Sequence, residues 1–211
     1  MKTIVITVLL VALLGAGTGI LFVYSGVYNV SAQSPHSAVS NWVLGATKDA
    51  SVSRRARSVE VPDLTSDALR LVGVNGFEAM CVGCHGAPGK KPGPLGQGLN
   101  PSPPDLQHSA REHSPAELFW VTKNGIKMTG MPAWGPTHDD EELWPLVALM
   151  SALPELDAKA YDDLVARAEG MGHHAPVDNA EHAHEPEVQT DATPPAQEPN
   201  TSAHDHSTHE H

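Results

Sequence analysis

The stretch Cys81-Val82-Gly83-Cys84-His85 constrains the chemistry of this chain more tightly than any other five residues do. Two thiols three positions apart can each add to one vinyl group of a haem, and the adjacent histidine then reaches the iron from the same side. The motif therefore predicts one covalently bound haem c, attached through Cys81 and Cys84, with His85 as an axial ligand of the iron.

A pair of cysteines at this spacing has two other interpretations. A thioredoxin-like redox pair should open a helix after a strand, but residues 64–80 have a helical pattern and no strand is evident there. A tetrahedral zinc site would need further cysteines or well-spaced histidines, and the chain contains 2 cysteines in all. Covalent haem is favoured over both.

From about Leu64 to Pro154 the chain resembles a mono-haem class I cytochrome c of the small bacterial membrane-anchored kind. Gly73, Phe77 and Cys81 match the family's G-x-x-x-[FY]-x-x-x-C helix, and a spacing of four places the glycine and the aromatic residue on one helix face. The resemblance implies that the C-terminal helix of the domain crosses there. It also implies an all-α class I cytochrome c fold, with few helices around the bound haem.

A second matching segment is Asn124-Gly-Ile-Lys-Met-Thr-Gly-Met-Pro-Ala-Trp134, which resembles the family's loop that supplies the sixth iron ligand. Met131 has the Gly-Met-Pro-Ala context of that loop, whereas Met128 lacks it and is expected to fill space beside the haem. A thioether is a soft, neutral ligand that favours ferrous iron and raises the potential relative to a second histidine. The resemblance therefore predicts Met131 as the second axial ligand.

Three further residues are candidates for the haem environment. Pro94 follows His85 by nine residues, and in related small cytochromes a proline carbonyl there accepts a hydrogen bond from Nδ1 of the ligand histidine. Trp120 and Trp134 are candidates either to donate to a haem propionate or to fill the core. Apolar contacts with the porphyrin are expected from six large side chains: Phe77, Leu95, Leu99, Phe119, Trp120 and Trp134.

The amino-terminal segment predicts a membrane anchor. No charged residue occurs from Thr3 to Val27, and at about 1.5 Å per residue this stretch is long enough to cross a hydrocarbon core of ~30 Å. A cleaved signal peptide with its site at Val30-Ser31-Ala32 is the alternative, although its apolar region would be unusually long. We therefore expect residues 1–30 to form a transmembrane helix that crosses the bacterial cytoplasmic membrane once. The resemblance implies that haem is attached outside that membrane, which places the following residues in the periplasm.

Residues 31–62 are expected to form a periplasmic linker before a haem domain over residues 63–155. An arginine cluster ends the linker, and four apolar residues recur in it at helical spacing: Val39, Trp42, Val43 and Ala46. The pattern fits either a plain spacer or a helix that lies on the membrane surface.

Two helix starts are marked inside the haem domain. Ser114-Pro115-Ala116-Glu117 has an N-cap, a proline at the first helical position and a capping-box glutamate. Asp139 or Asp140 is expected to cap the last core helix, in which Pro145 should remove a backbone hydrogen bond. Residues 156–172 are expected to form a short helix or a linker.

Residues 173–211 differ sharply in composition from the rest. They contain eight acidic residues and no lysine or arginine, so about −8 of the net charge of −12 belongs to this tail. A hydrophobic core cannot form from such a sequence, which predicts a disordered tail. Paired imidazoles suit copper, nickel or zinc, so the tail is predicted to bind divalent metal; a solvated acidic extension is the alternative. The candidate ligands are His173, His174, His182, His184, His204, His206, His209 and His211.

Iron that is held by two protein ligands has no open position for a substrate or for dioxygen. The chain is therefore interpreted as an electron carrier and not as an enzyme. Its expected partners are redox protein donors and acceptors, such as membrane respiratory complexes or dehydrogenases, and no nucleic acid. Two alternatives remain: a periplasmic metal-handling protein that uses its histidine-rich tail, and a fixed cytochrome subunit of a larger membrane oxidoreductase.

Overall fold

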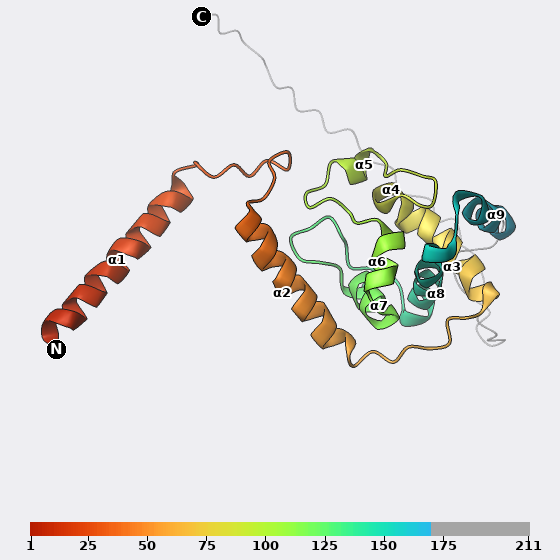
Figure 1. Cartoon of the computed structure of the whole chain (residues 1–211), viewed down its shortest axis with the longest axis horizontal. Helices are drawn as coiled ribbons and strands as arrows, with labels where there is room; N and C mark the ends of the chain where they lie inside the picture. The colour runs from red at the N-terminus through yellow and green to blue at the C-terminus, as the bar shows by residue number, and fades with distance from the viewer. Residues whose placement is uncertain (170–211) are drawn as a thin grey trace, which may run out of the picture. The chain divides into compact units, whose positions relative to one another are not determined.

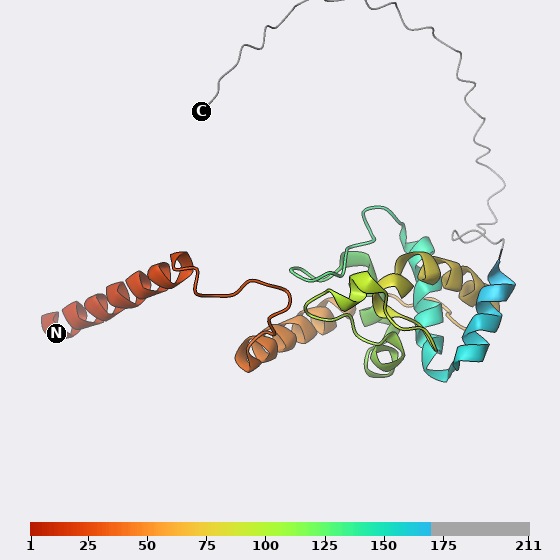
Figure 2. The ribbon, with the colours of Figure 1, turned by 90° about the horizontal axis from the view of Figure 1, so that it is seen from above.

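The computed structural model describes residues 1–169 of the chain. Within these residues the regular elements are helices and no strand is present, which confirms the expected all-α fold (Figures 1 and 2). The elements are α1 (Lys2–Tyr24), α2 (Ala38–Ala56), α3 (Asp67–Met80), α4 (Val82–His85), α5 (Pro94–Gln97), α6 (Leu106–Glu112), α7 (Pro115–Asn124), α8 (Asp140–Ala152), the 3-10 turn η1 (Leu153–Glu155) and α9 (Ala158–Ala168).

Helix α1 is a single apolar helix of 23 residues, and its most apolar 18 residues have a mean hydropathy of 2.6. None of these 18 residues is buried against the rest of the described chain. Its length and composition meet the requirements of a membrane span, and a signal sequence at an amino terminus meets them too.

Helix α2 occupies most of the segment expected to be a linker. It begins after Ser37, whose side chain accepts a hydrogen bond from the backbone N–H of Ser40. Its C-terminal half packs on α7 and buries Val52 and Ala56, which are 6% and 4% exposed. Trp42, in its N-terminal half, is 73% exposed. Residues 31–62 therefore contain a helix that is attached to the following domain along part of its length.

Helices α3 and α8 make the closest crossing in the domain. A Cβ placed on Gly73 would lie 2.7 Å from the carbonyl carbon of Pro145 and 3.2 Å from the Cβ of Leu149. Only a glycine lets the two backbones approach this closely. The crossing at Gly73 that the resemblance implied is confirmed.

The core lies where α3, α8 and α9 meet. Phe77 of α3 and Tyr161 of α9 are both fully buried, and their rings form an edge-to-face contact with centroids 6.3 Å apart. Leucines of α8 at spacings of three fill the space beside them: Leu143, Leu146 and Leu149. The apolar stripe of α8 thus faces inward along its whole length.

The helix starts follow the local sequence closely. Ser114 and Glu117 form a reciprocal capping box at the start of α7, and Asp139 and Glu142 form another at the start of α8. Helix α8 begins at Asp140 and continues through Pro145. Both predicted starts are therefore confirmed, with Asp139 as the cap of the last core helix.

Helix α9 packs on α3 and extends the domain beyond residue 155. The Nδ2 of Asn75 donates to the carbonyl of Ala168, and the hydroxyl of Tyr161 donates to Glu78. Burial raises the pKa of the Tyr161 hydroxyl, and the neighbouring Glu78 carboxylate raises it further.

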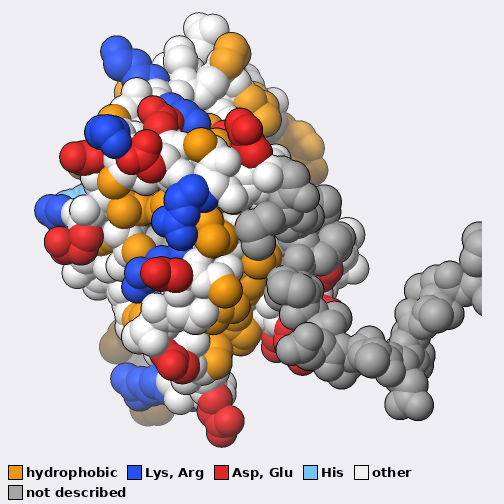
Figure 3. Space-filling view, turned by 90° about the vertical axis from the view of Figure 1, so that its right-hand side faces the viewer, with side chains coloured by type: hydrophobic (Ala, Val, Ile, Leu, Met, Phe, Trp, Pro, Cys, Tyr) orange, Lys and Arg blue, Asp and Glu red, His pale blue; other side chains and the backbone are white. Residues whose placement is uncertain are grey.

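On the face shown in Figure 3, the right-hand side of Figure 1, basic and acidic side chains are interspersed and not segregated.

Candidate haem-binding site

Cys81, Cys84 and His85 lie on the wall of a cavity of about 510 Å³. This volume is within the range of cofactor sites in proteins. The cavity is bounded by the end of α3, by α4 and α7, by the loops 98–105 and 126–134, and by α2. Segments from most of the described domain thus converge on the residues of the motif.

The motif itself forms the junction of α3 and α4. The backbone N–H groups of Cys84 and His85 both donate to the carbonyl of Cys81, at 3.1 and 2.9 Å, so the three side chains belong to one tight helical turn. Burial raises the pKa of the Cys81 thiol to about 12, and the neighbouring Cys84 contributes further. A thioredoxin-like nucleophile needs a lowered thiol pKa, so this environment disfavours that interpretation.

A proline carbonyl does contact His85, but it is not the one expected. Nδ1 of His85 lies 2.9 Å from the carbonyl oxygen of Pro104, which accepts a hydrogen bond from it. The prediction for Pro94 is wrong, because Pro94 is the first residue of α5 and its carbonyl accepts from the N–H of Gly98 inside that turn. In a neutral imidazole, a proton on Nδ1 for the bond to Pro104 leaves Nε2 available to bind a metal.

The loop after α7 places Met131 on the cavity wall. Its start and end are held by backbone bonds, from Ile126 N–H to the carbonyl of Met131 and from Trp134 N–H to the carbonyl of Thr122. The hydroxyl of Thr129 accepts from the N–H of Met131 at 3.1 Å. Met128 lies outside the lining and is 93% exposed, so the expectation that it fills space beside the haem is wrong.

Of the large apolar side chains expected around the porphyrin, Leu95, Leu99 and Trp134 line the cavity. The other three do not. Phe77 is in the core against Tyr161, and Phe119 stacks on Trp144 with ring centroids 3.9 Å apart.

The prediction that Trp120 belongs to the haem environment is also wrong. It lines a separate surface cavity of about 600 Å³, together with Arg55, whose guanidinium lies 6.0 Å from the centroid of the indole ring. Trp120 is in α7, and Trp134 is in the loop that follows α7. Only the tertiary fold determines which of the two lines the haem cavity.

Sequence reasoning missed the contribution of α2 to this cavity. Four of its residues line the wall: Lys48, Asp49, Val52 and Ser53. A weak signal was present, since Val52 and Ala56 are apolar at a spacing of four, which marks a helix face that can pack. Met80, Leu106 and Pro104 also line the cavity and carry no signature of their own in the sequence.

The donors on the cavity wall fit a covalently attached haem: two thiols, an imidazole, a thioether and an apolar lining. They do not fit a zinc site. Among residues 1–169, no group of three or more His, Cys, Asp or Glu side chains is arranged to hold a metal ion.

Comparison with known families agrees with this geometry. The family model described as Cytochrome C oxidase, cbb3-type, subunit III matches residues 71–150. This region is a class I c-type cytochrome domain. Searches of curated proteins and of solved structures gave no match.

The matched part of the cytochrome domain includes both the haem-binding motif and the loop that carries Met131. Helices α2 and α9 lie outside the match, although α2 contributes to the cavity and α9 to the core. The tail histidines from His173 to His211 lie outside the residues that the structure describes.

Proposed function

We propose that this protein is a membrane-anchored electron carrier. Its single haem is attached covalently at Cys81 and Cys84, and His85 and Met131 are the ligands of the haem iron. The observation that supports the proposal most directly is that all four side chains line one cavity. They come from two segments about fifty residues apart in sequence, the α3–α4 junction and the loop after α7. A thioether and an imidazole are the ligand pair expected of an electron-transfer haem.

The bound haem supplies a one-electron redox centre. The protein's own residues hold and orient it. The bond from Nδ1 of His85 to the Pro104 carbonyl fixes the imidazole and strengthens its donation to the metal. Thr129 fixes the backbone of Met131. If His85 and Met131 both ligate the iron, the haem would exchange electrons and would have no open position for a substrate.

We place the cytochrome domain in the periplasm, tethered by α1 to the bacterial cytoplasmic membrane. The support is the apolar length of α1 together with covalent haem attachment, which the resemblance to class I cytochromes associates with that compartment. Redox protein donors and acceptors, such as membrane respiratory complexes or dehydrogenases, would then meet the domain at the membrane surface.

A fixed subunit of a larger membrane oxidoreductase is the second candidate. The description of the matching family, an oxidase subunit, favours it. Copurification from membranes solubilised in mild detergent distinguishes the two candidates. A carrier should be purified as a single chain, whereas a subunit should be purified together with its partners in a constant ratio.

The axial ligand is tested by a matched pair of substitutions, Met131→Leu and Met128→Leu. Met131→Leu should abolish the weak long-wavelength absorption band of a methionine-bound ferric haem and lower the reduction potential, because the soft ligand is lost. Met128→Leu should change neither, since Met128 is exposed. The reverse pattern would refute the assignment, and haem that is extractable by acidified acetone would refute covalent attachment.

A further inference from the structure

We propose that helix α2, which lies outside the matched cytochrome region, is a structural wall of the haem cavity that keeps water from one side of the haem. The inference rests on the proposed haem function. It assigns cofactor contacts to residues that precede the cytochrome domain.

Four residues of α2 line the cavity together with Cys81, His85 and Met131. Lys48 and Val52 are four residues apart, as are Asp49 and Ser53, so the four side chains share one face of the helix. A helix that only connected the anchor to the domain would have no reason to present one face to the cofactor site.

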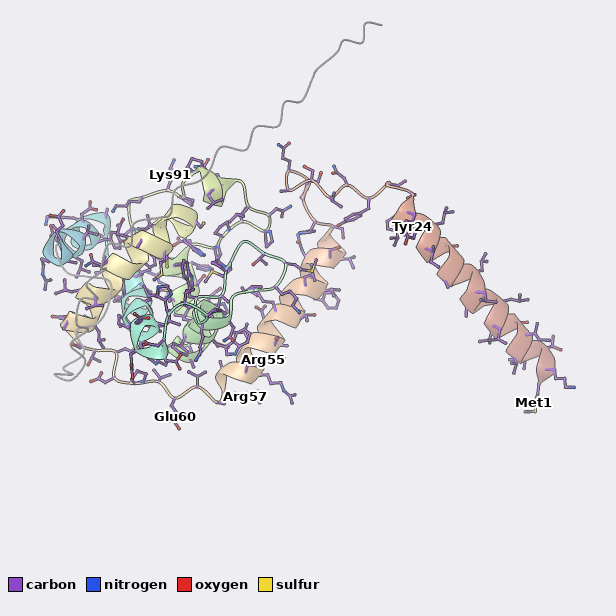
Figure 4. The ribbon with its side chains drawn as sticks, turned by 180° about the vertical axis from the view of Figure 1, so that it is seen from behind. Met1, Tyr24, Arg55, Arg57, Glu60 and Lys91 are labelled. Carbon is purple, nitrogen blue, oxygen red and sulfur yellow. The ribbon has the colours of Figure 1, made fainter. Side chains whose placement is uncertain are left out.

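The wall is fastened to the domain near both ends. At the C-terminal end, Val52 and Ala56 are buried against α7, and the hydroxyl of Ser53 donates to a carboxylate oxygen of Glu117. Before the N-terminal end, the Nδ2 of Asn100 donates to the carbonyl of Ser34 at 2.9 Å. Arg55, labelled in Figure 4 at the end of α2, adds the contact with Trp120.

The two fastening points belong to different segments of the domain. Glu117 is in α7, and Asn100 is in the loop 98–105 that also carries the Pro104 carbonyl. The segment that contains α2 is therefore held to the domain at two points, one before the helix and one in its C-terminal half.

The chemistry of the lining predicts how the wall acts. Lys48 and Asp49 form an ion pair at 2.9 Å, so their charges largely offset each other. Among the four lining residues of α2, Val52 is the apolar one, and its side chain would exclude water from that side of the haem. A drier, less polar environment disfavours the more positively charged ferric state and raises the reduction potential.

The test compares Val52→Asp with Val43→Asp in the full-length, haem-loaded protein in detergent. Val43 is on the same helix, is 46% exposed and does not line the cavity. Two readouts apply: the reduction potential, and the rate of tryptic cleavage after Arg54 and Arg55, which reports the release of α2 from the domain.

Val52→Asp should lower the potential, whether α2 is released or stays in place with a carboxylate facing the cavity, and faster tryptic cleavage identifies its release. Val43→Asp should leave both readouts at the wild-type values. If Val52→Asp accumulates without haem, the uncharged Val52→Ser and Val43→Ser pair decides by the same measurements. Equal potentials in the haem-bearing Val52 and Val43 variants would overturn this inference alone, whereas wild-type protein without covalent haem would overturn the proposed function.

Discussion

At the scale of single residues, two glycines determine how closely the backbones pack around the haem motif. A Cβ on Gly96 would lie 2.8 Å from the Cα of Cys84, so α5 rests directly on the turn that contains the motif. Gly73 plays the same part between α3 and α8. Neither close approach is possible for a residue with a side chain unless a backbone moves.

Gly73→Ala should destabilise the domain by about 1–3 kcal/mol, because the added methyl group overlaps the Pro145 carbonyl and forces the two helices apart. Denaturant unfolding of the ferric protein measures the loss. Gly45→Ala is the matched control, since Gly45 is also helical but has no atom within 4 Å of an added Cβ. That substitution should stabilise α2 by up to roughly 1 kcal/mol. Equal stability of the two variants would contradict the crossing described for Gly73.

At the scale of elements, α2 and α7 are joined through Glu117. The Ser53 hydroxyl, followed by the backbone N–H of Ser114, holds the pKa of this carboxyl below its ordinary value. The side chain is 17% exposed, and the imidazole of His113 lies 3.8 Å away. One carboxylate thus completes the start of α7 and also fastens α2.

The stability of this junction should depend on acid. Because the folded-state pKa of Glu117 is lower than its unfolded value, the ionised form stabilises the fold above the unfolded pKa, and this contribution is lost as pH falls through the folded pKa. The melting temperature should therefore fall as the pH is lowered below about 4.3, the ordinary pKa of a glutamate. Glu117→Gln should melt at a lower temperature at neutral pH and show less of this acid-dependent decline.

Glu112→Gln is the control for this experiment. Glu112 is in the neighbouring helix α6, its side chain is 60% exposed, and its only described ion pair is with His108. An acid profile of Glu117→Gln that matches those of Glu112→Gln and the wild type would show that the bond to Ser53 does not link the two helices in solution.

At the scale of the whole molecule, the chain combines three kinds of segment with different physical requirements. Helix α1 is apolar and has no buried partner among the described residues. The domain that follows α1 in the sequence buries its apolar residues in its own core. The histidine-rich segment 173–211 contains few apolar residues and eight acidic ones. The anchor and the tail should therefore be separable from the haem chemistry.

The anchor prediction concerns the mature amino terminus. Mass spectrometry of protein isolated from membranes should find peptides from before Ser31, because the apolar stretch is longer than the 7–15 residues usual in signal peptides. A soluble mature form that begins at Gln33 would identify α1 as part of a signal peptide.

The tail prediction concerns metal. A chain that ends at Gly172 should keep the haem spectrum and melting temperature of the full-length protein but should lose binding of copper, nickel or zinc. Binding by the full-length chain should weaken as pH falls through about 6.5, because protonated imidazole cannot coordinate a metal. Replacing the eight tail histidines with glutamine keeps the acidic residues and should abolish binding equally. Unchanged binding in either variant would reduce the tail to an acidic extension.

Much of the fold and half of the haem site follow from local sequence. The order Cys81, Cys84, His85 brings three donors into one helical turn without help from distant residues. Capping boxes such as Ser114 with Glu117 act over three positions, so their residues are near each other before any tertiary contact forms. Interactions of this range can be recognised in a sequence because spacing alone brings the groups together.

The rest of the site was decided by contacts between segments that are far apart in the chain. Pro104, not Pro94, reaches His85 because α5 uses the Pro94 carbonyl within its own turn. Trp134 lines the cavity and Trp120 does not, and α2 forms a wall because Val52 packs on α7. The spacing of residues in the sequence does not predict these long-range contacts. They depend on which surfaces bury the most apolar area once all the helices are packed together.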